Sequence, residues 1–214
     1  MLSRIKMKNL TKENVICAWF FSGLRDLFFA FQIDSPFRYE PFMNTMGFEK
    51  ICKSYLLAEN SFVYENLEDK EVMEKIDSLA KKWGHDLKGM VKNIKNSIVS
   101  QAIESVTSGV YDGYTGKDLI EVMQAAYLEC RYPVPKHIHE KFPIKGKPGM
   151  NWEPIASSGI EKFCFAFTRK VIIKLKEEFN VPIPKERFNE IITGEAGVRF
   201  CNLFLKDTPD EFLE

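Results

Sequence analysis

The chain has 214 residues, of which 45% are hydrophobic, and its 30 lysines and arginines balance 30 aspartates and glutamates. A formal net charge of zero excludes a global field that would draw the whole protein to nucleic acid or anionic lipid, although a local patch remains open. The length suits one large domain, or a compact domain with a small appendage, and 18 phenylalanines are enough to fill a core.

The cysteines are scattered and odd in number. They are Cys17, Cys52, Cys130, Cys164 and Cys201. No CxxC pair occurs, so neither a zinc ribbon nor a disulfide framework is indicated, and we predict reduced thiols. The HxH spacing of His137 and His139 is seen in metal sites, but the third ligand, Glu140 or His85, cannot be placed from the sequence, so we predict no metal site and no cofactor. Reduced thiols are typical of a cytoplasmic protein, and the N-terminus shows no signal-peptide pattern.

The first predicted helix runs from about Lys12 to Gln32 and contains the most apolar window of the chain, VICAWFFSGLRDLFFAFQI. This window has the length of a membrane span, but Arg25 and Asp26 lie at its centre, where charges are costly in lipid. Aromatic side chains surround almost its whole circumference, which is typical of a central helix in a bundle. We therefore predict a buried core helix and no membrane contact.

A second helix is predicted from about Glu40 to Glu59, because its apolar residues recur at helical spacing. They are Met43, Met46, Gly47, Ile51, Tyr55 and Ala58. On another face, Glu49 and Lys53 form an i, i+4 pair. In the simplest interpretation this pair is solvated and contributes little to stability.

The segment DKEVMEKIDSLAKKWGHDLKGMVKNI predicts a helix that is broken at Gly84, with Asp86 favouring a new helical start. A further helix is predicted from about Asn96 to Val110. The YDGYTGK segment that follows is a cluster of turn residues, and no alternating strand pattern is present anywhere in the chain.

The next helix begins at a Thr115 or Asp118 cap and continues to Arg131, before Pro133 ends it. The segment from Pro133 to Pro154 holds five prolines and two glycines, so we predict a long loop of the kind that often carries function.

A long last helix is predicted from about Ile155 to Phe179, and a short tail helix from about Lys185 to Ile192. Together these patterns predict an all-α protein. We expect a bundle of about five helices over residues 1–180, with a C-terminal extension, residues 181–214, packed on the bundle.

Three short motifs occur in order: FEKICKSYLL in the second helix, GHDLKGMV after the helix break, and RYP at a helix end. With them the chain resembles the HEPN superfamily of helical bundles, over roughly Val15 to Phe179. Its members often show an EK-x-x-K-like helix, a GH-[DN]-L turn and, in one branch, an RYP helix end. The resemblance implies a homodimer formed through the long helices and a toxin, antiphage or stress-defence setting.

The resemblance implies two alternatives, of which one is a metal-independent ribonuclease. Many HEPN proteins are RNases in which an Arg is followed, after four to six residues, by a His, and the two groups face each other across a dimer interface. Arg131 and His137 have this spacing. The imidazole would take a proton from a ribose 2′-OH and the guanidinium would stabilise the phosphorane. Pro133 and Pro135, however, interrupt the helical geometry of the RNase branch. Without this role, Arg131 caps its helix, and His137 and its neighbour His139 are ordinary loop residues.

The other alternative is a non-catalytic site for nucleotides or other small anionic ligands, as in HEPN branches that lack the Arg/His pair. Its predicted residues are Lys53, His85, Arg131 and Tyr132, which would form a small cationic site if they converge. His85 lies at a helix start, where backbone N–H groups attract anions. In the opposing interpretation, the ring of His85 packs against the bundle and hydrogen-bonds a backbone carbonyl, while Asp86 caps the helix.

The sequence thus leads us to expect a HEPN-like protein that binds nucleotide or RNA without catalysis. Two further functions stay open, the ribonuclease and a purely structural bundle for protein interaction.

Overall fold

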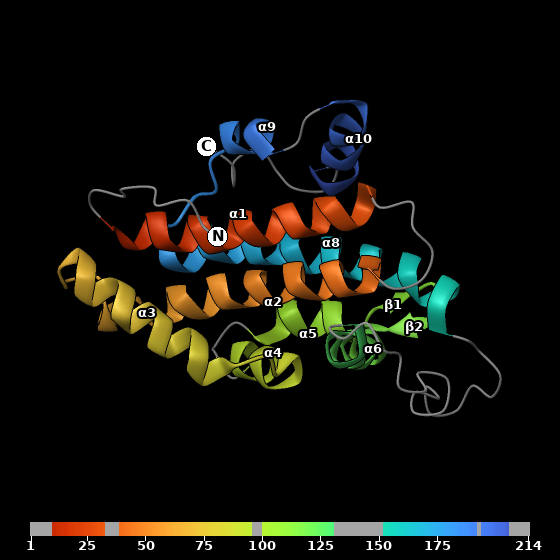
Figure 1. Ribbon diagram of the computed structural model, residues 1–214, viewed down its shortest axis with the longest axis horizontal. Coiled ribbons are helices and arrows are strands. Elements are labelled where there is room, and N and C mark those ends of the chain that lie inside the picture. Colours follow the sequence, from red (N-terminus) through yellow and green to blue (C-terminus); the bar gives the residue numbers. More distant parts are fainter. Residues whose placement is uncertain (1–9, 33–38, 96–99, 131–151, 192–193, 206–214) are drawn as a thin grey trace.

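In the computed structural model, the described residues are 10–32, 39–95, 100–130, 152–191 and 194–205. They form helices and one small hairpin, which confirms the predicted all-α bundle (Figure 1). The elements are α1 (Lys12–Gln32), α2 (Tyr39–Glu59), η1 (Ser61–Val63), α3 (Asp69–Trp83), α4 (Leu87–Lys95), α5 (Ser100–Ser108), β1 (Val110–Tyr111), β2 (Tyr114–Thr115), α6 (Gly116–Cys130), α8 (Trp152–Phe179), α9 (Glu186–Ile191) and α10 (Gly194–Leu205).

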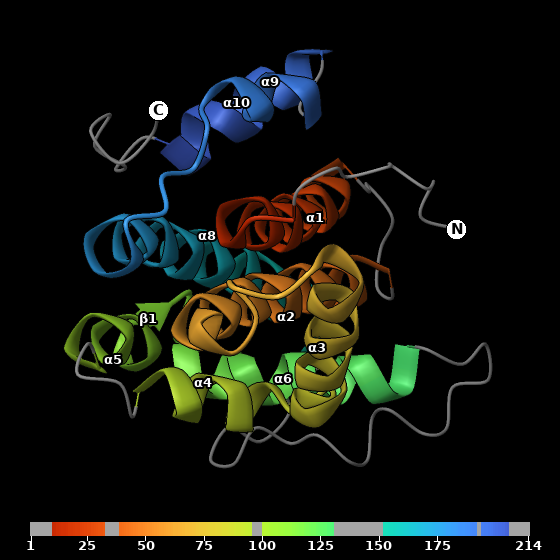
Figure 2. The ribbon, with the colours of Figure 1, turned by 90° about the vertical axis from the view of Figure 1, so that its left-hand side faces the viewer.

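The helices lie in three layers, seen end-on in Figure 2. The central layer holds α1, α2 and α8; below it lie α4, α5 and α6, and above it lie α9 and α10. Within the central layer, α1 and α2 approach so closely that a Cβ atom built on Gly23 would lie 2.7 Å from the carbonyl oxygen of Gly47. Only glycine allows this contact between two helix backbones.

The first helix is the core helix that the sequence predicts. In the described part of the chain it alone is long and apolar enough to cross a membrane by length and composition, a test that core helices also pass. Ile16, Phe20 and Leu24 are fully buried, and the helix lies between α2 and α8 on one side and α9 and α10 on the other. Burial in the bundle accounts for its apolar character.

The helix break at Gly84 is confirmed, because α3 ends at Trp83 and α4 begins at Leu87. Gly84 has a φ of 58°, a positive value that glycine adopts readily and that other residues rarely adopt. Asp86 is the predicted cap: its Oδ1 accepts a hydrogen bond of 3.0 Å from the backbone N–H of Gly89.

Residues 110–115, which overlap the YDGYTGK segment, form a two-stranded antiparallel hairpin, although no strand was predicted. Its turn residues, Asp112 and Gly113, both have positive φ, as the favoured two-residue hairpin turn requires. The preceding helix ends at Ser108, so its predicted extension to Val110 is wrong. These strands have two residues each, which is too short for an alternating pattern to be visible.

The helix after the hairpin, α6, starts with a reciprocal cap. Thr115 Oγ1 accepts from the N–H of Asp118 at 3.2 Å, and Asp118 Oδ2 accepts from the N–H of Thr115 at 3.0 Å. Both predicted cap residues therefore take part. The predicted end of this helix at Arg131 lies outside the described residues.

The last long helix, α8, begins at Trp152 rather than Ile155, so Pro154 belongs to its first turn and not to the preceding loop. Proline is tolerated there because the first N–H groups of a helix have no intrahelical partner. The rest of the predicted loop, residues 133–151, lies outside the described residues.

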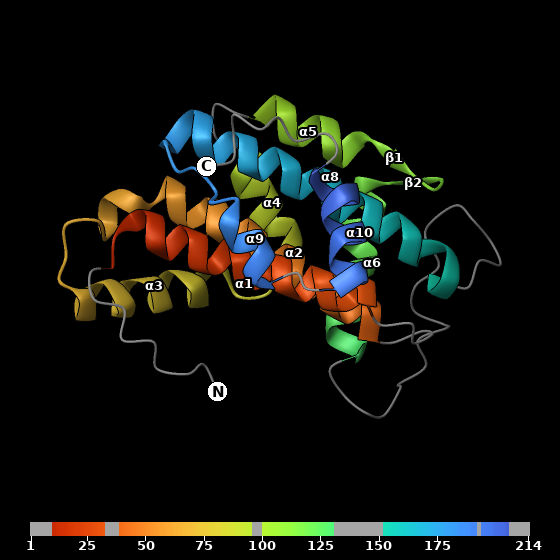
Figure 3. The ribbon, with the colours of Figure 1, turned by 90° about the horizontal axis from the view of Figure 1, so that it is seen from above.

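The tail contains two described helices where one was predicted. The predicted one is α9, and α10 was missed. Figure 3 shows α9 lying over α1, and α10 lying across α1 and α8. The ring of Phe200 on α10 contacts Phe28 and Phe31 of α1 and Phe165 of α8, with centroid distances of 5.2–5.5 Å. These aromatic contacts hold the extension on the bundle.

Candidate functional site

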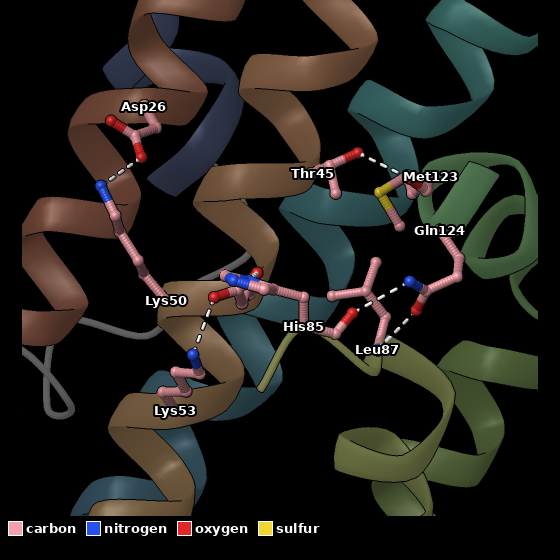
Figure 4. Close-up of polar contacts among 9 residues, drawn as sticks. Asp26, Thr45, Lys50, Lys53, His85, Leu87, Met123 and Gln124 are labelled. Atoms are coloured by element: carbon pink, nitrogen blue, oxygen red, sulfur yellow. Dashed lines mark hydrogen bonds and ion pairs between the residues drawn. The ribbon is translucent and has the colours of Figure 1, made fainter. Parts of the chain in front are cut away.

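Lys53 and His85 meet at a shared carboxylate, that of Glu49 (Figure 4). Lys53 Nζ lies 2.8 Å from Glu49 Oε1, and His85 Nδ1 lies 2.9 Å from Glu49 Oε2. Glu49 and Lys53 lie one turn apart on α2, while His85 lies in the turn between α3 and α4. The structure thus brings together two of the predicted site residues through a third that was noted only as the helical partner of Lys53.

The Glu49–Lys53 pair is buried, so its prediction as a solvated pair is wrong. Each side chain is only 5% exposed. Lys53 Nζ also lies 5.8 Å from the ring centroid of Trp19 on α1, within reach of a cation–π interaction. Lys53 therefore faces the protein interior and holds Glu49 in place, since an unpaired buried ammonium would be costly.

His85 has 49% of its side chain exposed. Its ring stacks on Tyr127 of α6, with centroids 4.4 Å apart and the planes tilted by 26°. Tyr127 in turn lies nearly parallel to Phe42 of α2 at 6.2 Å. The three rings come from three elements and lie roughly parallel to one another in two pairwise contacts, and the ring of His85 is half exposed.

The turn that carries His85 is held by α6. The side-chain amide of Gln124 donates to the backbone carbonyl of His85 at 2.9 Å, and its Oε1 accepts from the N–H of Leu87 at 2.7 Å. One carboxamide thus bridges the two sides of the turn (Figure 4). The backbone of His85 is fixed by Gln124 and its ring by Glu49 and Tyr127, so the side chain is preorganised.

Neither sequence interpretation of His85 is complete. The ring packs against the bundle and Asp86 caps the helix, as one interpretation holds, but the ring nitrogen contacts a carboxylate rather than a backbone carbonyl. The other interpretation expects the N–H groups of α4 to attract an anion. Two of them, those of Leu87 and Gly89, already donate to protein side chains.

Three predicted site residues, Arg131, Tyr132 and His137, lie outside the described residues, as does His139. Glu49, Tyr127 and Gln124 were not predicted as site residues. Only Glu49 has a signal in the sequence, its spacing from Lys53, because the other two residues reach His85 through tertiary structure.

Thiolate and metal chemistry find no support among the described residues. They contain no group of three His, Cys, Asp or Glu side chains that would hold a metal ion. Burial raises the pKa of the Cys17 thiol to about 11 and raises those of Cys52 and Cys164 as well. These thiols therefore stay protonated and are poor nucleophiles.

A separate cleft of about 390 Å³ lies where the end of α2 meets α3 and α4. It is lined by Leu56, Glu59, Asn60, Lys82, Trp83, Asp86, Gly89, Met90 and Asn93. The lining contains acidic and basic side chains, two amides and an indole. This mixture does not indicate any particular class of ligand.

Comparison of the chain with family models, with curated proteins and with solved structures finds no match. Function must therefore be argued from the geometry of the site, and the resemblance to HEPN proteins rests on the sequence motifs.

Proposed function

We propose that this bundle is a HEPN-like protein that binds a nucleotide or RNA, without cleaving it, at the exposed face of His85. The observation that carries the proposal is the stack of His85, Tyr127 and Phe42, whose outer ring is half exposed. Proteins commonly hold nucleotides and single-stranded RNA by stacking bases on aromatic side chains, since every base has a π-face. A bound base would extend this stack by one ring.

The rigidity of the platform supports this role. Glu49 holds the ring edge of His85, and Gln124 holds its backbone, so little conformational freedom is lost when a ligand binds. The buried ion pair behind the ring supplies that rigidity, and Lys53 acts as a positioning residue for Glu49 rather than as a direct phosphate contact.

The phosphate groups require cationic or hydrogen-bonding partners as well. We propose Arg131 and Tyr132 for this role. The helix that carries Tyr127 to the stack ends at Cys130, and Arg131 follows directly in the sequence. An Arg131→Ala variant should therefore weaken binding of nucleotides more than binding of the corresponding nucleosides, as measured by titration calorimetry.

The binding proposal is tested by thermal unfolding with a panel of ribonucleotides and short single-stranded RNAs. At about 100 times Kd, a ligand specific for the folded state adds about 2.7 kcal/mol, which raises the Tm of a chain of this size by about 5–10 °C. His85→Ala should abolish the shift. The control, Lys88→Ala, removes a nearby surface cation and should retain it. If no ligand of the panel raises the Tm of the wild-type protein, the proposal is contradicted.

The ribonuclease alternative depends on Arg131 and His137, which lie outside the described residues. Our proposal predicts that purified protein leaves RNA intact in the presence of EDTA. Metal-independent cleavage that disappears in a folded His137→Ala variant would replace the binding function with the enzymatic one.

A further inference from the structure

The hydrogen-bonding pattern of His85 follows from its partners. Glu49 forms an ion pair with Lys53, and an ionised carboxylate only accepts hydrogen bonds, so the proton between Glu49 Oε2 and His85 must lie on Nδ1. Lys53 already balances the charge of Glu49 in this buried pair. With the Nδ1 proton directed to Glu49, the neutral form of the imidazole carries its lone pair on Nε2.

The lone pair of Nε2 lies at the exposed part of the ring. One face of the imidazole is covered by Tyr127, and the Nδ1 edge is turned to Glu49. The exposed half of the side chain therefore consists of the opposite face and the Nε2 edge. Within the part of the chain that the structure describes, no residue forms a hydrogen bond with Nε2.

We propose that Nε2 of His85 accepts a hydrogen bond from the ribose 2′-OH of the bound nucleotide, so that the site selects ribonucleotides over deoxyribonucleotides. This inference rests on the proposed function. A base stacked on the outer face lies parallel to the imidazole. The polar groups on the edge of the base therefore lie outside the plane of the imidazole ring, whereas the lone pair of Nε2 lies in that plane. The attached ribose extends beyond the base and reaches that plane, and the 2′-OH is the donor that distinguishes RNA from DNA.

The selectivity is tested by measuring Kd for ATP and dATP, and for single-stranded RNA and DNA oligonucleotides of matched sequence, by fluorescence anisotropy or calorimetry. One hydrogen bond at a half-exposed site predicts that the ribo form binds about three- to tenfold more tightly. The matched variant is His85→Phe, which keeps a ring on Tyr127 but has no acceptor. It should bind both forms, with a ratio of Kd values close to one.

The protonation pattern is tested separately by NMR of protein labelled with ¹⁵N-histidine, in which only three histidines give signals. The wild type should show a proton on Nδ1 and none on Nε2 of His85, identified by the signal missing in His85→Phe. Glu49→Gln should lose this fixed pattern, because a carboxamide can either donate to Nδ1 or accept from it.

The outcomes separate the two proposals. Equal affinity of the wild type for ribo and deoxy ligands, or a proton on Nε2 in the free protein, would overturn the selectivity inference and leave nucleotide binding intact. Absence of binding by any ribo or deoxy ligand would end both.

Discussion

Two lysines about one turn apart on α2 form ion pairs of different kinds. Lys50 contacts Asp26 of α1 at 2.5 Å, and this pair joins two core helices. Lys53 contacts Glu49, whose second oxygen contacts the half-exposed His85. The residue types are nearly the same in both pairs. The two pairs differ in that Glu49 also contacts His85, which connects its buried charge to the protein surface.

The carboxyl groups of the two pairs also differ in what surrounds them. Burial raises the pKa of Asp26, and this effect outweighs the hydrogen bond and the positive charge of Lys50, which lower it. Glu49 accepts hydrogen bonds at both oxygens. We therefore expect Asp26 to be dispensable as a charge and Glu49 to be essential.

The largest effect is expected from Glu49→Leu, which leaves the ammonium of Lys53 buried without its partner. Breaking a buried pair in this way costs about 3–5 kcal/mol, measured as a loss of unfolding free energy in urea. The double variant Glu49→Leu with Lys53→Met removes both charges and should recover most of the loss. A single variant as stable as the wild type would show that the pair does not determine stability here.

A smaller effect is expected from Gln124→Ala, which removes both hydrogen bonds to the turn of His85. The N–H of Leu87 loses its partner, so we expect a loss of about 1–3 kcal/mol and faster hydrogen exchange at that amide. The Tm shift caused by nucleotides should fall as well. Glu121→Ala, on the exposed surface of the same helix, is the control and should change neither quantity.

Removing the charge of Asp26, unlike removing that of Glu49, should not destabilise the protein. Because the pKa of Asp26 is raised in the folded state, the folded protein holds the protonated form more tightly than the unfolded chain does. The Asp26 carboxyl therefore stabilises the fold fully at pH values below its pKa in the unfolded chain, about 3.9. This contribution is lost as the pH rises through its pKa in the folded protein. Asp26→Asn should thus resemble the wild type in acid and equal or exceed its stability at neutral pH, by about 1 kcal/mol at most.

This prediction is measured as the difference in unfolding free energy between Asp26→Asn and the wild type at several pH values. A difference that increasingly favours the wild type as the pH rises, as expected for a strongly stabilising ion pair, would contradict it.

The smallest effect is expected from Lys88→Ala. Lys88 contacts Glu121 at 2.7 Å, but both side chains are more than half exposed. Exposed pairs of this kind contribute little, so the unfolding free energy should change by less than about 0.5 kcal/mol. A larger loss would mean that charge near His85 matters for stability even at the surface.

Much of the fold was predictable because its signals are local. The helix of Lys12–Gln32, the break at Gly84 and the caps at Asp86, Thr115 and Asp118 all depend on residues within a few positions of one another. The hairpin strands were missed because two residues show no alternation. The missed helix α10 is short, and its Phe200 and Phe204 become informative only when α1 and α8 lie beneath them.

The site was predictable only in part, for a related reason. The spacing of Glu49 and Lys53 predicts an ion pair, but the same spacing occurs on buried and on exposed faces of helices. Burial here depends on Trp19 and His85, which are far away in the sequence. Likewise, no local pattern indicates that Tyr127 stacks on a ring 42 positions earlier in the chain.

The contact between Gly23 and Gly47 has a consequence for how the sequence can vary. Any side chain at either position would push α1 away from α2, because the added atom meets backbone or the buried residues Leu27 and Ile51. That movement would displace Asp26 from Lys50 and Trp19 from Lys53. In a complete substitution scan, these two glycines should tolerate fewer replacements than His85 itself, although neither touches the proposed ligand.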